Sequence, residues 1–254
     1  MRSLEYNADL VLHLVKRSFH LRYKGSVIGI LWYLLFPLSQ LLVLVFLFGK
    51  VVPLNIDAYP AFVFCALLPW VWFSSCLNSS ASLFIANRDL IRKPNFAPLV
   101  LIVVDTLSNL LAYLIFLPVL FLMLALYDHY VSLSLIYFPL LILIQGLLII
   151  GLGMIISTMN VFYRDIQQIV SVGVMLLFYL TPVFYRSEAI SSNFKLLFTL
   201  NPIAVLIQSY RSVIFYGSAP EWGPLLLSAA ISVIICVFGF LIYKRRFPDI
   251  FDAL

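Results

Sequence analysis

An arginine and an aspartate lie side by side in the stretch NVFYRDIQQI, residues 160–169, between two long apolar runs. No Lys, Arg, Asp or Glu occurs from His129 to Tyr163, and none occurs from Ile166 to Tyr185. Such a pair could bind a charged group on a partner through directional hydrogen bonds, or it could simply form the polar tip of a tight loop. The residue types alone favour the polar tip, because a short cytoplasmic loop usually carries a positive charge.

The residues needed for catalysis are missing from the sequence. The three histidines do not form an HExxH pattern, and neither a GxSxG motif nor a GxxxxGK[ST] phosphate loop occurs. Asp105 is the one acidic residue inside a long apolar run, which is too little for ion-coupled transport. We expect its carboxylate to be hydrogen-bonded inside the protein or hydrated near the cytoplasmic face. The sequence therefore predicts no catalytic residue, no metal site and no cofactor in this chain.

The composition is typical of an integral membrane protein. Of 254 residues, 63% are hydrophobic and 11% are charged, with a mean hydropathy of +1.07, whereas soluble domains carry roughly 25% charged residues. Six stretches are long and apolar enough to cross a bilayer, which takes about 20 residues per helix. We predict a single all-α domain over residues 1–254 with six transmembrane helices, at residues 27–49, 59–86, 97–127, 130–160, 167–185 and 222–243. Pro37 and Pro182 are expected to kink two of them.

The N-terminal residues 1–25 are predicted to form an amphipathic helix that lies in the membrane interface. Its polar stripe follows helical spacing and consists of His13, Lys16, Arg17, His20 and Lys24. With the N-terminus inside, only four of the 16 Lys and Arg residues, Lys50, Arg186, Lys195 and Arg211, face outward. The positive-inside rule therefore places both termini in the cytoplasm. Anionic membrane lipids then account for the net charge of +5, and no nucleic acid is expected as a partner.

The segment between Arg186 and Glu221 is too polar to form another full span. Its apolar part is about a dozen residues long, short of the membrane thickness. Asn201 and Pro202 are typical of a helix start, and Gly217 is typical of a helix end. We predict a helix over residues 202–216 in an external segment that dips into the membrane or lies flat on it.

Five segments, in order and spanning nearly the whole chain, resemble the membrane subunits of type-2 ATP-binding-cassette (ABC) exporters of polysaccharide, the O-antigen and teichoic acid permeases. They are LRYKGSVIGILWYLLFPL (residues 21–38), LPWVWFSSCLNSSASLFIANRDLIRK (68–93), MNVFYRDIQQIV (159–170), YLTPVFY (179–185) and LNPIAVLIQSYRSVIFYG (200–217). One departure follows the basic loop, where Phe96-Ala97-Pro98 replaces the Phe-Pro common in the family.

The resemblance implies a half-transporter. Such permeases form homodimers and bind two copies of a separate nucleotide-binding subunit, which would hold ATP and Mg. The external segment would be the family's re-entrant pair near the channel exit. Residues 160–167 match the family's cytoplasmic coupling helix, so the resemblance assigns contact with the ATPase to Tyr163, Arg164, Asp165 and Ile166. The N-terminal stripe could bind lipid head groups or the lipid-pyrophosphate end of the substrate, and we favour the head groups.

Aromatic rings in the first and fifth spans are candidates for the polysaccharide channel, because these spans line it in the family. Ring faces contact sugar C–H groups without fixing a register, which suits a sliding chain. The candidates are Trp32, Tyr33, Phe36, Tyr179, Phe184 and Tyr185. The alternative is an interfacial aromatic belt, which membrane proteins have whatever their function.

We therefore expect a permease subunit, without its own ATPase site, that exports lipid-linked, O-antigen-like polysaccharide across the bacterial cytoplasmic (inner) membrane. The same fold could instead export teichoic acid, another lipid or a drug. A membrane-embedded transferase is a third possibility, but it would need paired carboxylates or a histidine near one face. Asp89, Asp105 and Asp165 form no evident motif of that kind.

Overall fold

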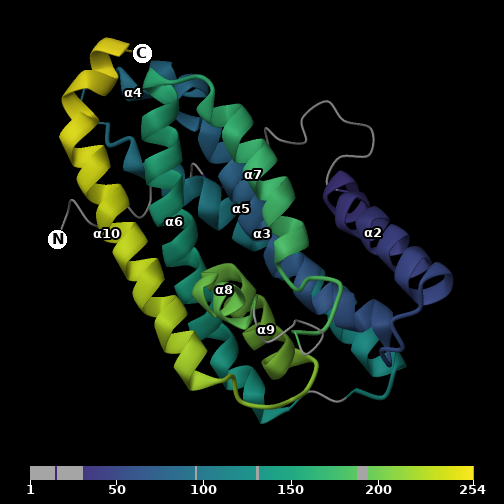
Figure 1. Cartoon of the computed structure of the whole chain (residues 1–254). Helices are drawn as coiled ribbons and strands as arrows, with labels where there is room; N and C mark the ends of the chain where they lie inside the picture. The colour runs from purple at the N-terminus through teal and green to yellow at the C-terminus, as the bar shows by residue number, and fades with distance from the viewer. Residues whose placement is uncertain (1–14, 16–30, 95, 130–131, 188–193, 254) are drawn as a thin grey trace.

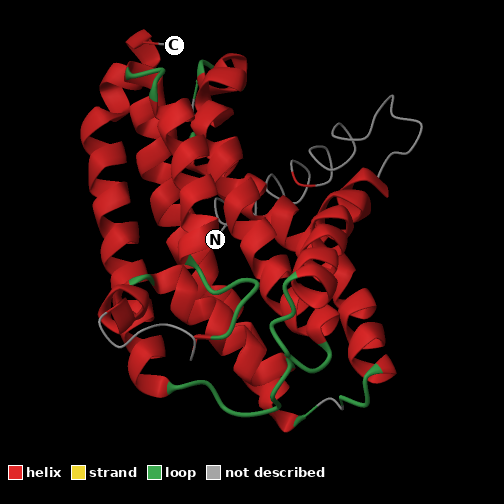
Figure 2. Cartoon of the chain, turned by 45° about the vertical axis from the view of Figure 1, so that its right-hand side comes forward, coloured by secondary structure: helices red, strands yellow, loops and turns green. Residues whose placement is uncertain are grey.

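The computed structural model describes residues 15, 31–94, 96–129, 132–187 and 194–253 of the chain. Every regular element in these residues is a helix, as Figure 2 shows. The all-α fold class is therefore confirmed for the described part. The predicted interface helix of residues 1–25 lies outside the described residues apart from Val15, and so does its stripe of His13, Lys16, Arg17, His20 and Lys24.

Within the described residues, four helices are long and apolar enough to cross a membrane: α3 (Tyr59–Ala86), α5 (Leu99–Leu126), α6 (Phe138–Phe162) with the preceding short turn η2 (Leu133–Tyr137), and α10 (Trp222–Ala253). The 28 residues of α3 or α5 extend about 42 Å at 1.5 Å per residue, more than the hydrocarbon thickness of about 30 Å. The chain is therefore a multi-pass membrane protein.

Two shorter apolar helices occupy the remaining predicted spans. The first is α2 (Leu31–Phe46), continued by the π-helical turn η1 (Leu47–Val51), and the second is α7 (Ile166–Leu180). With 15 residues, α7 extends only about 22 Å. A six-span arrangement stays a prediction for these two helices, because neither reaches the length of the other four.

Successive long helices run in alternating directions (Figure 1). The C-terminus of α10, the short helix α4 (Arg88–Ile91) and the α6–α7 connection lie at one end of the bundle, here called the C-terminal end. The connections α2–α3, α5–α6 and α9–α10 lie at the opposite end. The two remaining helices, α8 (Lys195–Leu200) and α9 (Pro202–Ile214), are also nearer this opposite end.

Helix α7 ends five residues before the predicted limit of its span, residue 185. Thr181 has extended backbone, with φ −104° and ψ 136°, because a following proline disfavours helical geometry in the residue before it. The expected kink at Pro182 is therefore wrong, since the helix stops there. The chain turns away through residues 181–185.

Helix α10 continues ten residues beyond residue 243, the predicted end of its span. The extension carries charged residues, but its Ile250 is fully buried and packs in a cluster with Ile91 of α4 and Phe84 of α3. This long-range burial keeps the chain helical where the apolar run has ended. The extension also ties the C-terminus to the α3–α5 connection.

Helix α3 forms the centre of the bundle, and its first half, from Ala61 to Leu68, is almost completely buried. Polar side chains fix neighbouring helices to it: Gln145 of α6 donates a hydrogen bond to the Pro69 carbonyl at 2.8 Å. Trp72 stacks on Tyr113 of α5 with ring centroids 5.8 Å apart. Such contacts hold helices together where lipid removes the hydrophobic drive for association.

Asp105 of α5 is buried, and Ser79 of α3 donates a hydrogen bond to its carboxylate. The expectation of a carboxylate hydrogen-bonded inside the bundle is therefore confirmed. The contact joins two membrane helices and needs no role in transport.

Helices α6 and α10 approach closely at Gly151. A Cβ atom added there would lie 2.7 Å from the Cys236 backbone nitrogen, and one added at Gly239 would overlap the Gly151 carbonyl. Only glycine permits two helix backbones to come so near.

We expect Gly151→Ala to destabilise the protein by about 2 kcal/mol, because the two backbones must move apart. Gly146→Ala is the matched control in the same helix, since its added Cβ would meet only the Trp72 ring at 3.9 Å. Thermal unfolding in detergent should show a lower transition temperature for Gly151→Ala than for the wild type. The control should unfold at the wild-type temperature. Equal transition temperatures in both variants would contradict the close contact.

Candidate functional site

The α6–α7 connection is a tight turn at the C-terminal end of the bundle (Figure 1). Helix α6 ends at Phe162, Tyr163 adopts extended backbone with φ −130° and ψ 100°, and α7 begins at Ile166. The Ile166 amide donates to the Tyr163 carbonyl at 3.2 Å, which closes the turn. The expected coupling segment, residues 160–167, is thus divided between the end of one helix, a turn and the start of the next.

The turn presents its charged pair to solvent. Tyr163 is 60% exposed, and Arg164 and Asp165 are also exposed. In the described chain neither charged side chain has an ion-pair or hydrogen-bond partner. Ile166 is half-buried and packs against the large cluster of buried apolar side chains that surrounds α3. A partner could therefore contact the Tyr163 ring and the charges of Arg164 and Asp165, while Ile166 holds the turn to the protein.

The residues under the turn are firmly packed. Phe162 and Val161 pack against the small cluster that holds Ile91 and Ile250, and the Arg246 guanidinium of α10 lies 5.4 Å from the Phe162 ring. A force applied to the turn would therefore reach α6, α4 and the C-terminal part of α10 together.

A second constellation lies around Arg211 of α9, which is only 4% exposed although it carries a charge. Its guanidinium donates to the carbonyls of Pro182 at 2.5 Å, Tyr185 at 3.2 Å, and Val183. Nε donates to the Phe62 carbonyl of α3 at 3.4 Å, and the cationic carbon lies 3.7 Å from the Phe62 ring centroid. One side chain thus holds α9, the bend after α7 and α3 together.

Sequence reasoning missed this role and treated Arg211 only as an external charge. A signal was available, because Arg211 is the only cation between Lys195 and Lys244 and lies within an apolar helix. A charge in such a position needs buried partners.

Helix α9 begins and ends close to the predicted limits. Asn201 precedes it, Pro202 is in its first turn, and Gly217 follows with a positive φ of 63°. The Asn201 side chain makes no cap hydrogen bond. Its carbonyl accepts from the Ala204 amide at 3.1 Å instead.

The candidate channel residues fall into two groups. Tyr179 lies in the last turn of α7, and Phe184 and Tyr185 follow that helix. The Phe184 and Tyr185 rings are in contact, with centroids 5.0 Å apart. The Tyr185 hydroxyl donates to the Tyr179 carbonyl at 3.3 Å. Phe184 also stacks on Phe48 of η1, 5.0 Å between centroids. Its ring is therefore packed in the protein.

The other group belongs to α2, with Trp32 and Tyr33 in its first turn and Phe36 one turn later. Phe36 is 64% exposed and Tyr179 is 62% exposed. Either ring could face a pathway, another chain or lipid.

Comparison with known proteins identifies the family. The sequence model of the "ABC-2 type transporter" family matches residues 9–215. The chain belongs to this family. The matched region of the ABC-2 protein includes the α6–α7 turn, the bend at Pro182 and Arg211, and it ends just before α10.

Several relatives resemble this ABC-2 protein along its length. The O-antigen export system permease protein RfbA of Myxococcus xanthus is 34% identical over 100% of this chain and 98% of its own. A protein of the same name from Klebsiella pneumoniae is 33% identical over 98% of this chain and 97% of its own. The polysialic acid transport protein KpsM of Escherichia coli is 24% identical over 91% of this chain and 90% of its own. The resemblance drawn from the five segments is confirmed.

Proposed function

We propose that the protein is the permease subunit of an ATP-driven exporter of lipid-linked, O-antigen-like polysaccharide. The observation that carries this proposal is 34% identity, over the whole length of both chains, to an O-antigen export permease. Several long apolar helices and the lack of a phosphate loop agree with a membrane subunit whose energy comes from another chain.

The proposed assembly is a homodimer with two copies of an ABC nucleotide-binding subunit, which binds ATP and Mg. The exposed side of α7 supports the homodimer, because Val174 is the only side chain of that helix that is buried in the single chain. The exposed large apolar side chains of the helix recur at helical spacing: Ile169, Val172, Met175, Leu176, Tyr179 and Leu180. In a dimer this face could be covered by the second copy.

The proposed topology is six spans in the bacterial inner membrane with both termini in the cytoplasm. The alternating helix directions support it, as does the basic character of the C-terminal end, which carries Arg88, Arg92, Lys93, Arg164, Lys244, Arg245 and Arg246. The predicted helix of residues 1–25 would lie along this cytoplasmic face among membrane lipids.

The α6–α7 turn is the proposed contact with the ATPase. Arg164 and Asp165 are exposed, whereas Val161 and Phe162 before them are packed against neighbouring helices. A charge-assisted contact of the pair with the ATPase could therefore transmit a movement of the ATPase to these helices. Trp32, Tyr33, Phe36, Tyr179, Phe184 and Tyr185 stay the proposed channel residues, and the exposed Phe36 and Tyr179 are the best placed to meet substrate.

Export and copurification together test this function. A strain that lacks its own O-antigen permease should regain surface polysaccharide when this chain is expressed with its ATPase, and the tagged chain should copurify in mild detergent with a protein that has a phosphate loop. Export of teichoic acid or of another lipid, without O-antigen, would contradict the proposed substrate but still support a transporter. Copurification with glycosyltransferases and no ATPase would contradict the proposal.

A further inference from the structure

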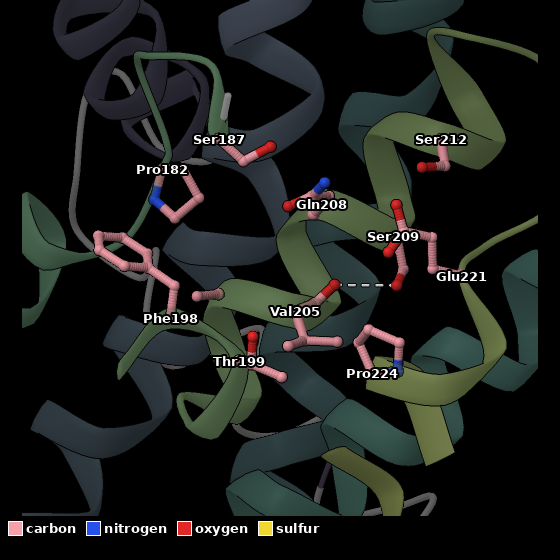
Figure 3. A pocket seen from close by; sticks show the side chains of 11 residues that line it. Pro182, Ser187, Phe198, Thr199, Val205, Gln208, Ser209, Ser212, Glu221 and Pro224 are labelled. Carbon is pink, nitrogen blue, oxygen red and sulfur yellow. Dashed lines mark hydrogen bonds between the residues drawn. The ribbon is translucent and has the colours of Figure 1, made fainter. Parts of the chain in front are cut away.

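A pocket of about 280 Å³ lies at the end of the bundle opposite the C-terminus, between α8, α9, the Pro182 bend and the start of α10 (Figure 3). Its walls include the polar side chains of Gln208, Ser209, Ser212 and Glu221. Neither the proposed ATPase contact nor the candidate channel residues make use of it.

The polar groups of this pocket offer unused hydrogen-bonding capacity. Ser209 is buried and donates to the Val205 carbonyl at 2.9 Å, which leaves its oxygen as an acceptor (Figure 3). Among the residues that the structure covers, the side chains of Gln208, Ser212 and Glu221 have no hydrogen-bond partner. An amide, two hydroxyls and a carboxylate can together both donate to and accept from a ligand.

The same pocket also has apolar lining residues, which are Phe198, Pro182 and Pro224. In Figure 3 the Phe198 and Pro182 rings lie on one side of the cavity, and Ser209 and Glu221 lie on the other. A sugar ring has this combination of properties, with hydroxyls at its edge and C–H groups on its face that pack on rings.

Charge and size narrow the ligand further. Among the described residues, no Lys or Arg lines the pocket, and the Glu221 carboxylate would repel a phosphate or an acidic sugar. The described residues hold no cluster of three metal-ligating side chains either. A volume of about 280 Å³ is just below the 300–1,000 Å³ of sites for drug-sized ligands. That leaves room for one sugar unit.

We propose that this pocket binds a single neutral or amino-sugar unit. The sugar could belong to a polysaccharide chain that leaves the transporter, a source that rests on the proposed function, or it could be free sugar outside the cell. Both sources share the same chemistry, and binding itself can be tested without transport. The pocket shares the Pro182 bend with Arg211, so a bound sugar would contact a segment that Arg211 fixes.

Trp222 provides a reporter for binding, because it follows Glu221 directly and is 47% exposed, whereas Trp70 and Trp72 are buried. The full chain in detergent would be titrated with methyl glucopyranoside, methyl glucosaminide and methyl glucuronide while tryptophan fluorescence is recorded. We expect saturable, millimolar binding of the first two sugars and binding of the glucuronide that is about tenfold weaker. Trp222→Phe should abolish the signal, which assigns it to this site.

Variants of the pocket give the second part of the test. Gln208→Leu should weaken binding of the neutral sugar about tenfold, because an amide with two hydrogen-bonding atoms is lost. Glu221→Gln should remove the discrimination against the glucuronide. Asp57→Asn is the matched control, since Asp57 is an exposed carboxylate in the α2–α3 connection at the same end of the bundle and does not line the pocket.

The outcomes separate this inference from the proposed function. No saturable binding of any of the three sugars would overturn it, even if the wild-type chain restores polysaccharide export. Sugar binding by a chain that fails to restore export would support the pocket and contradict the proposed function. If Gln208→Leu weakens both binding and export, the bound sugar comes from the exported chain; if it weakens binding alone, the pocket takes free sugar.

Discussion

Arg211→Met is expected to lower the free energy of unfolding by about 3–5 kcal/mol, because it leaves buried carbonyls without their donor. These carbonyls belong to Pro182, Val183 and Tyr185 of the bend and to Phe62 of α3. Methionine has a similar length but no hydrogen-bond donor. Thermal unfolding in detergent should show a fall of about 10 °C in transition temperature.

Two further variants make the Arg211 result specific. Arg211→Lys keeps the charge but has a single compact ammonium group in place of the planar fork, so we expect it to recover only part of the lost stability. Arg186→Met is the matched control, because Arg186 directly follows the same bend and is exposed. It should change stability by less than about 0.5 kcal/mol. A stable Arg211→Met protein would show that the carbonyls are satisfied by other means.

Loss of Arg211 should also reduce export. The guanidinium holds the bend that follows α7, and Tyr185 of that bend is a candidate channel residue. If Arg211→Met is expressed at a lower temperature, so that it folds, surface polysaccharide should still be reduced. Normal export from the folded variant would limit Arg211 to a role in stability.

Arg164→Glu is expected to abolish polysaccharide export and to weaken copurification of the ATPase by about 10–100-fold. A charge-assisted hydrogen bond contributes about 1.5–3 kcal/mol, and the reversed charge would repel the group that Arg164 contacts. Stability should be unchanged, because Arg164 is exposed in the turn. The amount of ATPase bound to the tagged chain, the surface polysaccharide and the transition temperature are the three measurements.

The controls for Arg164 distinguish position from charge. Arg164→Lys retains the charge and should keep part of the export, whereas Arg186→Glu makes the same charge change at an exposed arginine of the opposite end and should have little effect. Unchanged export in Arg164→Glu would contradict a coupling role for the turn. Loss of both export and stability would instead indicate a structural role.

Several features of this protein could be predicted from local sequence. The long uncharged runs must form helices in a membrane, because each backbone N–H and C=O group then needs a hydrogen-bond partner within its own segment. The start of α9 at Asn201-Pro202 and its end before Gly217 follow from the backbone preferences of proline and glycine. The end of α7 before Pro182 could have been predicted by the same local rule, which favours a stop over a kink.

The Arg164–Asp165 turn was visible as an interruption of the apolar runs, and the family resemblance pointed to it as a contact site. Sequence alone did not show that Tyr163 would break the helix there, or that Phe162 would rest on a cluster built from α4 and α10. The aromatic residues could be selected by type. Only their surroundings separate the exposed Tyr179 from Phe184, whose ring packs on Phe48.

By itself, the sequence determined the helical class, the long apolar helices and the family, because uncharged length, proline and glycine act within a single segment. Tertiary structure decided which distant groups meet: Arg211 with Phe62, 149 residues away in the chain, and Gly151 with the backbone of Cys236. It also extended α10 to Ala253 through the burial of Ile250, and it assembled one pocket from α8, α9, α10 and the Pro182 bend. These contacts depend on how helices pack across the whole chain, and no local spacing of residues specifies that.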